Sequence, residues 1–225
     1  MKKIFSVAID GPAGAGKSTI AKSLSKKLGV IYVDTGAMYR AMALFLLRRG
    51  VDPKDSTAIS KNCADADISI AFENGAQQVM LNGENVSGLI RTEEVSSMAS
   101  KSSVNPDVRA KLVELQQKLA EKEALVMDGR DIGTVVLPKA EVKIYLTASS
   151  AVRAKRRYDE LKAKGEDCDL KQIEADIIER DHRDMTREIS PLKQADDAVL
   201  VDTSDMGIEE AENALMAIVE DKING

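Results

Sequence analysis

The chain has 225 residues, of which 44% are hydrophobic and 31% charged, a balance typical of a globular protein with a buried core. Its 32 basic and 37 acidic side chains give a formal net charge of −5, with no Trp, four Tyr and three Phe. Because nucleic-acid binding needs positive charge for phosphates and aromatic rings for bases, this composition disfavours that function. Cys63 and Cys168 lie far apart, which predicts free thiols in a reducing compartment and excludes a disulfide framework or a zinc knuckle.

The N-terminal apolar segment does not have the pattern of a secretion signal. Asp10 ends the run Ile4–Ile9 after six residues, which is too short for the apolar region of a signal peptide. The longest apolar run, residues 41–47, is also far shorter than a membrane span. We therefore expect a cytoplasmic protein that has neither a membrane nor a nucleic acid as partner. Because no interface signal is visible, we expect a monomer.

Strand-like and helix-like segments alternate along the chain, as in α/β proteins with a mainly parallel sheet flanked by helices. Apolar, β-prone runs predict buried strands at residues 4–9, 30–33, 124–127, 142–146 and 198–201. Apolar residues at helical spacing predict helices at residues 17–28, 35–49, 107–122, 151–164, 169–186 and 208–223.

One stretch departs from this alternation. Apolar and polar residues alternate over residues 68–72, and the pairs Asn74-Gly75 and Asn82-Gly83 then bracket a short run at 78–81. Asn-Gly is typical of tight turns between antiparallel strands. We therefore predict a small three-stranded antiparallel insert between Ile68 and about Val86.

The residues between the first strand and the first helix match the phosphate-binding pattern GxxxxGK[ST]. Glycines let backbone amides turn toward a phosphate, and the N-terminus of the following helix favours the same negative charge. Lys17 is expected to reach the β- and γ-phosphates, and the Ser18 hydroxyl to face Mg²⁺. The pattern thus predicts binding of a nucleoside triphosphate with Mg²⁺. The expected binding residues are Gly11, Pro12, Ala13, Gly14, Ala15, Gly16, Lys17, Ser18 and Thr19.

Arginines are concentrated near the C-terminal part of the chain. The GTPase motifs DxxG and NKxD are absent, and six of the twelve arginines fall within 35 residues. Their spacing puts each group of three on one face of a helix. They form either a mobile flap that grips phosphates or a solvated charged face, since acidic residues are interleaved. The six are Arg153, Arg156, Arg157, Arg180, Arg183 and Arg187.

Three residues follow predicted parallel strands, where ligands of α/β proteins bind. Arg40 and Arg130 are expected at this edge of the sheet, either on a ligand or in a structural role at the surface. Asp128 either caps its strand, orders the waters of Mg²⁺ or accepts a hydrogen bond from the nucleophile. His182, the single histidine, is expected to be a surface residue of a helix.

Several segments together resemble bacterial cytidylate kinases, over residues 4 to about 205. The resembling segments are residues 10–18 (DGPAGAGKS), 34–40 (DTGAMYR), 86–87, 90–95 (IRTEEV), 128–136 (DGRDIGTVV) and 179–184 (ERDHRD) with Arg187. The resemblance implies a P-loop nucleoside monophosphate kinase fold with a β insert and a helical lid. It implies one domain over residues 1–225, a monophosphate-binding region at about 35–105 and a lid at about 150–188. It also implies transfer of phosphate from ATP, with Mg²⁺, to CMP and dCMP.

The resemblance also implies roles for single residues. The phosphate of CMP would be held by Thr35, Arg40 and Arg130. The cytosine would be read by Ser100, Arg109 and Asp131. The sugar and phosphate would be bound by Arg180, Asp184 and Arg187. Phosphoryl transfer would depend on Lys17, Arg130 and the lid arginines Arg153 and Arg157. The sequence has Thr35 where other members have Ser, and Ser18 where some have Gly.

Two other interpretations compete with this one. The chain could belong to another small-substrate kinase type, such as the adenylate or shikimate kinases, or it could be a regulatory module that binds a nucleotide without transferring phosphate. The first predicts a different phosphate acceptor, and the second predicts ATP binding without acceptor-dependent release of ADP.

Overall fold

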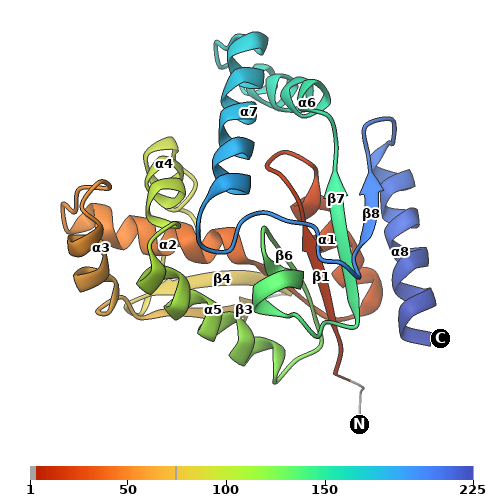
Figure 1. Ribbon diagram of the computed structural model, residues 1–225, viewed down its shortest axis with the longest axis horizontal. Helices are drawn as coiled ribbons and strands as arrows, with labels where there is room; N and C mark the ends of the chain where they lie inside the picture. The colour runs from red at the N-terminus through yellow and green to blue at the C-terminus, as the bar shows by residue number, and fades with distance from the viewer. Residues whose placement is uncertain (1–3, 74, 225) are drawn as a thin grey trace. The chain divides into compact units, whose positions relative to one another are not determined.

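The computed structural model describes residues 4–73 and 75–224. These form two compact units, which we describe separately. The core unit contains residues 5–30 together with those from 125 onward, and the inserted unit contains residues 31–124 and Ile4. In Figure 1 the core unit holds the red N-terminal strand and the green-to-blue C-terminal half of the chain.

The core unit is built on parallel strands in the order β6-β1-β7-β8. Their bounds are β1 (Ser6–Asp10), β6 (Leu125–Gly129), β7 (Val142–Thr147) and β8 (Val199–Asp202). The central strand β1 pairs with β6 on one side and β7 on the other, both in parallel register. Three consecutive β1 residues, Val7, Ala8 and Ile9, are fully buried. An apolar run buried on both faces is what a central parallel strand requires.

Helices accompany this sheet, and a pair of helices extends from it. Helix α1 packs against β6 and α8, and α8 packs against β7, so α1 and α8 cover the sheet together. Helices α6 and α7 pack against each other (Figure 1). They span the segment for which the resemblance implies a lid, and we call them the lid helices for that prediction. A short π-helix, η1, follows β6. The bounds are α1 (Lys17–Leu28), η1 (Ile132–Val136), α6 (Ser150–Ala163), α7 (Leu170–Thr186) and α8 (Ile208–Asn224).

The inserted unit is organised around α2. This helix contacts α3, α4 and α5 as well as the antiparallel strands β3 and β4, and its buried residues are largely apolar. The antiparallel sheet has the order β3-β4-β5. The bounds are β2 (Ile31–Asp34), α2 (Thr35–Arg48), α3 (Ser56–Cys63), β3 (Ile68–Glu73), β4 (Ala76–Leu81), β5 (Glu84–Asn85), α4 (Glu93–Ser102) and α5 (Pro106–Ala120).

The fold class predicted from the sequence is confirmed: a mainly parallel sheet with helices, and a separate three-stranded antiparallel sheet. The helix over residues 17–28 has the predicted bounds, and the other predicted strands and helices shift by one or two residues at their ends. The Asn82-Gly83 turn connects β4 to β5, with Asn82 at a φ of 49°. The other predicted turn includes Asn74, which lies outside the described residues.

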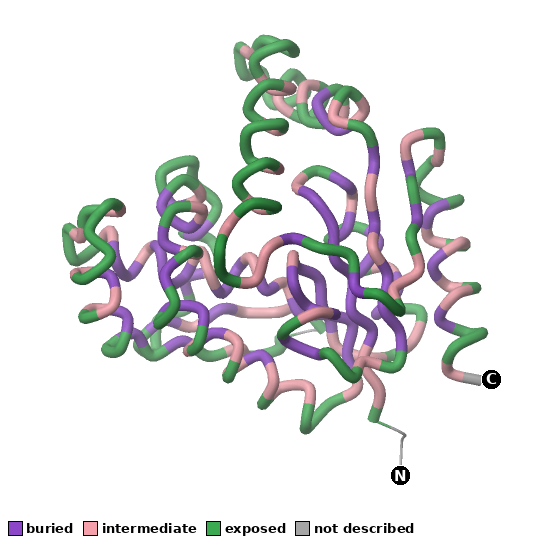
Figure 2. Tube along the Cα trace, in the orientation of Figure 1, coloured by how far each residue is buried: buried purple, intermediate pink, exposed green. Residues whose placement is uncertain are grey.

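Three elements were not predicted: α3, α4 and η1. Burial along the chain follows the predicted periodicities, with the purple segments of Figure 2 on the strands and on one side of most helices. Helix α7 differs, because none of its residues is buried. Among the described residues, no helix is both long enough and apolar enough to cross a bilayer.

Candidate active site

The phosphate-binding loop connects β1 to α1 in the core unit. Gly11 has a φ of +146°, and a Cβ there would lie 1.9 Å from the backbone oxygen of Leu146 on β7. Only glycine fits such an approach. Gly16 caps α1 in a left-handed conformation and makes no side-chain cap. The first amides of α1 therefore have no side-chain oxygen on them from this cap, the arrangement in which a helix N-terminus receives a phosphate.

Lys17 follows this loop as the first residue of α1. Its side chain is buried, and Nζ donates a hydrogen bond to the backbone oxygen of Pro12 at 2.7 Å. Burial, and then the guanidinium of Arg130, hold the pKa of Lys17 well below its usual value, while Asp128 and Asp10 oppose this shift. A phosphate bound in the loop would favour the charged ammonium, because opposite charges raise the pKa of a lysine.

Ser18 and Asp128 have the donor chemistry that Mg²⁺ requires. The Ser18 hydroxyl donates a hydrogen bond to Asp128 Oδ2 at 2.9 Å, so a hydroxyl oxygen and a carboxylate lie together beside the loop. Mg²⁺ in kinases takes one or two such oxygens and completes its shell with waters and substrate phosphates. Within the described part of the chain, no group of three or more His, Cys, Asp or Glu side chains could hold a metal ion. Ser18 and Asp128 thus fit the one or two protein oxygens of such a Mg²⁺ site.

Asp10 holds the segment after β6 through two hydrogen bonds. Backbone amides of Ile132 and Gly133 donate to Asp10 Oδ1 and Oδ2, each at 2.7 Å. Burial raises the pKa of Asp10 to about 6, although these two amides and Lys17 lower it. Asp10 therefore anchors the first turn of η1, which directly follows Arg130 and Asp131.

Arg130 and Asp131 each face a charged residue from the C-terminal end of α7. Arg130 Nε donates to Asp184 Oδ2 at 2.9 Å, and Arg187 Nη2 lies 3.8 Å from Asp131 Oδ1. All four side chains are at least three-quarters buried. The core unit thus brings together four of the predicted substrate-binding residues in two opposite-charge pairs.

The lid helices are joined to the phosphate-binding loop through Arg153. Its guanidinium forms two hydrogen bonds to Asp181 of α7, at 3.1 and 2.5 Å. It also donates to the backbone oxygens of Ala148 and of Ala13 in the loop, at 2.8 and 2.9 Å. In this conformation Arg153 links α6, α7 and the loop.

The other arginines of the lid helices have different surroundings. Arg156 Nη2 donates to the backbone oxygen of Thr203 at 2.8 Å. Arg157 is half exposed and pairs with Glu160 on the same helix at 3.2 Å. Arg180 is exposed, and its charge acts on Lys17. Arg153 therefore contacts the loop and Arg157 lies on a solvated face, while a mobile flap that grips phosphates stays a prediction. His182 is exposed on α7, as predicted.

The inserted unit holds the four remaining predicted site residues. Thr35 is buried in the first turn of α2, whose N-terminus is capped by Asp34 through a 2.9 Å hydrogen bond from the Ala37 amide. Arg40 Nη2 donates to the same carboxylate at 3.0 Å. Asp34 therefore holds Arg40 at the end of the helix where an anion is favoured.

Ser100 and Arg109 come from α4 and α5, both of which pack against α2. Arg109 is buried, donates to the backbone oxygen of Ser103 at 3.2 Å and lies over the ring of Tyr39 at 5.6 Å. Ser100 is half-buried. Thr35, Arg40, Ser100 and Arg109 are thus carried by three helices of one packed group.

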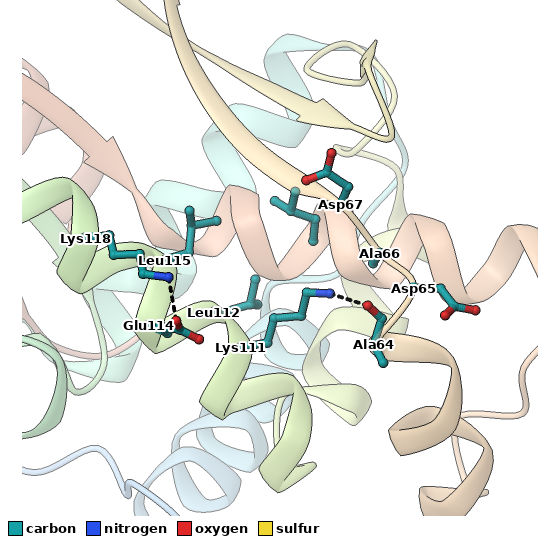
Figure 3. Close-up of a pocket in the computed structure, with 10 residues that line it drawn as sticks. Ala64, Asp65, Ala66, Asp67, Lys111, Leu112, Glu114, Leu115 and Lys118 are labelled. Atoms are coloured by element: carbon teal, nitrogen blue, oxygen red, sulfur yellow. Dashed lines mark hydrogen bonds and ion pairs between the residues drawn. The ribbon is translucent and has the colours of Figure 1, made fainter.

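A pocket of about 310 Å³ lies elsewhere in the inserted unit, between α5 and the segment that leads from α3 to β3 (Figure 3). Lys111 Nζ donates to the backbone oxygens of Cys63 and Ala64 at 3.0 and 2.7 Å, which satisfies carbonyls at the C-terminus of α3. None of the predicted site residues lines this pocket. Lys111, one of the two lysines that line the pocket, has a structural role.

Sequence reasoning assigned no role to Asp10 or Asp181. Asp10 could have been identified as an acidic residue that ends a buried strand immediately before a phosphate-binding loop, since such a charge needs partners. Asp181 lies in an acid-rich helix, where nothing in the spacing distinguishes it from its exposed neighbours. Cys63 and Cys168 are both free thiols, as predicted.

Comparison with solved structures agrees with the fold. An uncharacterized protein from Eubacterium ventriosum matches with a TM-score of 0.54 and 13% sequence identity, over 97% of this chain and 99% of that one. At that identity the likeness concerns the fold alone.

Comparison with protein sequences identifies the family. The family model for cytidylate kinase matches residues 7–221. A cytidylate kinase from Caldicellulosiruptor bescii is 52% identical over 93% of this chain and 92% of its own length. A cytidylate kinase from Listeria welshimeri is 50% identical over 100% of both chains. Since about half of the residues are shared along the whole length, this chain belongs to the cytidylate kinase family.

Proposed function

We propose that this protein transfers the γ-phosphoryl group of ATP to a phosphate oxygen of CMP or dCMP, which yields ADP and CDP or dCDP. The observation that carries the proposal is the 50% identity with a cytidylate kinase over 100% of both chains. The matched length covers both the phosphate-binding loop and the segment 128–136.

In the core unit, the loop residues 11–19 would bind the phosphates of ATP through backbone amides and the Lys17 ammonium. Ser18 would contact Mg²⁺ directly, and Asp128 would order its waters. When bound, Mg²⁺ supplies positive charge to the β- and γ-phosphate oxygens. The hydrogen bond between Ser18 and Asp128 supports this placement, because it puts both oxygens beside the loop.

The acceptor would be recognised by two groups of residues, one for its phosphate and one for its base. We assign the CMP phosphate to Thr35, Arg40 and Arg130, and the cytosine to Ser100, Arg109 and Asp131. Arg180, Asp184 and Arg187 would bind sugar and phosphate. Cytosine presents an amino donor beside two acceptors, so a carboxylate and an arginine complement it, whereas uracil would place an oxygen against Asp131.

Catalysis would consist of positioning and charge neutralisation. The acceptor oxygen is already anionic, so no general base is required. Lys17, Arg130, Arg153 and Arg157 would supply positive charge around the transferred group. Arg153 would reach a phosphate by exchanging its carboxylate partner Asp181 for phosphate oxygens, which offer the same bidentate geometry. Closure of the lid helices would exclude water and prevent hydrolysis of ATP.

We also propose a cytoplasmic monomer. The two free thiols are consistent with a reducing compartment. Sedimentation velocity at micromolar concentration measures the assembly state, and a dimer would contradict the monomer.

The test is ADP release from Mg²⁺-ATP with CMP, dCMP, UMP, AMP and shikimate as parallel acceptors. We expect strong turnover with CMP and dCMP and little with the other three. Turnover with AMP or shikimate instead would replace the proposed acceptor while keeping a kinase. ATP binding without turnover on any acceptor would identify a regulatory module and contradict the proposal.

A further inference from the structure

Asp10 is a buried carboxylate that has no substrate-binding role in the proposed function. It is only 5% exposed, and both of its oxygens accept short hydrogen bonds from consecutive amides. Burying a carboxylate costs free energy unless hydrogen bonds compensate it. The position of the two donating amides indicates what this carboxylate does.

The two amides belong to the backbone directly after Asp131. The amide of Ile132, which shares a peptide group with the Asp131 carbonyl, donates to Asp10 Oδ1. On the other side of that peptide group, the Asp131 carbonyl accepts hydrogen bonds from the amides of Val135 and Val136, at 2.9 and 3.1 Å. The peptide group is therefore fixed at both ends, by Asp10 and by η1.

This arrangement explains a π-helical turn in a place where the sequence has no helix signal. A π-helix is rare, and the first amides of a helix have no acceptor within it. Asp10 provides acceptors for two of them at once. Gly133 contributes by lacking a side chain, because a Cβ there would lie 3.4 Å from Asp10 Oδ2 and 3.2 Å from the stem of Lys143.

We infer that Asp10 is a positioning residue for base recognition: its carboxylate fixes the backbone that carries Asp131, and so aims the Asp131 carboxylate at the cytosine amino group. This inference rests on the proposed function, in which Asp131 reads the base. Asp10 itself touches no substrate. Removing one of its two acceptor oxygens should loosen the turn and weaken discrimination between CMP and UMP.

The test compares the ratio of kcat/KM for CMP to kcat/KM for UMP in the wild type and in Asp10→Asn. The amide side chain has nearly the same volume but only one acceptor oxygen, so one of the two backbone amides loses its partner. A displacement of recognition groups by about 1 Å can cost up to ~100-fold, and we expect the ratio to fall by about tenfold. A purely structural role would lower both values equally and leave the ratio unchanged.

Asp202→Asn is the matched control. Asp202 is also a core-unit carboxylate that accepts two hydrogen bonds, from the amide and the hydroxyl of Ser204 at 2.9 and 2.6 Å, but it is exposed at the end of β8. We expect its ratio to equal that of the wild type. Asp10→Ser, which removes the carboxylate while keeping a polar group, tests the same point if Asp10→Asn does not fold.

The outcomes separate the two proposals. If the wild type shows no preference for CMP, the proposed function fails and the inference with it. If the wild type prefers CMP and the Asp10 variant keeps the full ratio, the inference is wrong while the function stands. A lowered ratio in Asp10→Asn, with the Asp202→Asn ratio unchanged, supports both.

Discussion

Asp131 is proposed to contact the base and Asp10 to position the backbone that carries Asp131. Substitutions at the two positions test these roles one at a time. Asp131→Ala removes the carboxylate that would accept the cytosine amino group. Because one well-placed base contact contributes about 1–3 kcal/mol of discrimination, we expect the CMP-to-UMP ratio of kcat/KM to fall about tenfold or more. Steady-state assays with both acceptors measure it. Asp159→Ala, at an exposed carboxylate on α6, is the control, and an unchanged ratio in Asp131→Ala would contradict the assignment.

Asp10 should also leave a signature in the pH dependence of stability. Its pKa rises from 3.8 to about 6 on folding, chiefly through burial, so the folded state holds the proton more tightly than the unfolded state does. Stability contributed by this group is therefore present at low pH and is lost as the pH rises through that window. Relative to Asp10→Asn, the wild type should lose on the order of 1 kcal/mol between pH 5 and pH 7.5.

Urea denaturation of both proteins at several pH values measures that difference. A constant offset is also expected, because the variant loses one hydrogen bond at every pH. A difference in unfolding free energy that did not vary with pH would mean that Asp10 keeps an ordinary pKa in the folded protein.

At the scale of elements, the lid helices depend on ion pairs more than on apolar packing. Helix α7 buries no residue, and Arg153 joins it to α6 and to the phosphate-binding loop through Asp181. Asp181→Asn would leave a buried guanidinium without its counter-charge. Breaking such a pair costs on the order of 3 kcal/mol, and urea denaturation should show that loss.

The control for that variant is Asp159→Asn on the same lid. Asp159 pairs with Lys155 one turn away, both more than half exposed, so its substitution should change the free energy of unfolding by less than about 0.5 kcal/mol. Equal effects of the two variants would mean that the Arg153 pair adds nothing beyond a surface contact.

Arg157 offers the complementary case, a lid arginine with little structural duty. It is half exposed and pairs only weakly with its own helix. Arg157→Ala should leave stability nearly unchanged but lower kcat, since arginines that stabilise a transferring phosphoryl group contribute on the order of 10³-fold. Lys155→Ala, at an exposed cation of the same helix, should keep its kcat. An intact kcat in Arg157→Ala would remove this residue from the catalytic set.

Across the whole molecule, the sequence predicts best what local pattern determines. The buried strands and long helices have unmistakable periodicity, and the phosphate-binding loop has a fixed spacing. Helices α3 and α4 are short, with 8 and 10 residues, too few for a clear apolar stripe. Their capping residues Asp55 and Thr92 were the signal available, because each accepts a hydrogen bond from an amide three residues on.

What the sequence could not supply is structure that depends on distant partners. The turn of η1 depends on Asp10, which lies more than a hundred residues earlier. The pairing of Arg153 with Asp181, rather than with a neighbouring acid of α7, follows from how the two lid helices pack. The predicted site residues came from the resemblance to a family, whereas these two supporting carboxylates emerged only from the fold.

The insertion of one unit into the other has a consequence for synthesis on the ribosome. Strand β1 emerges first, but its partner in register, starting with Ser6 opposite Leu125, is made only after the inserted unit. At roughly 5–20 residues per second, β1 stays unpaired for on the order of ten seconds. Within the inserted unit, the Ile31 amide donates to the Ala124 oxygen at 3.3 Å. Once that unit has folded, the chain enters and leaves it at adjacent points, so β1 and β6 have only a short loop left to close.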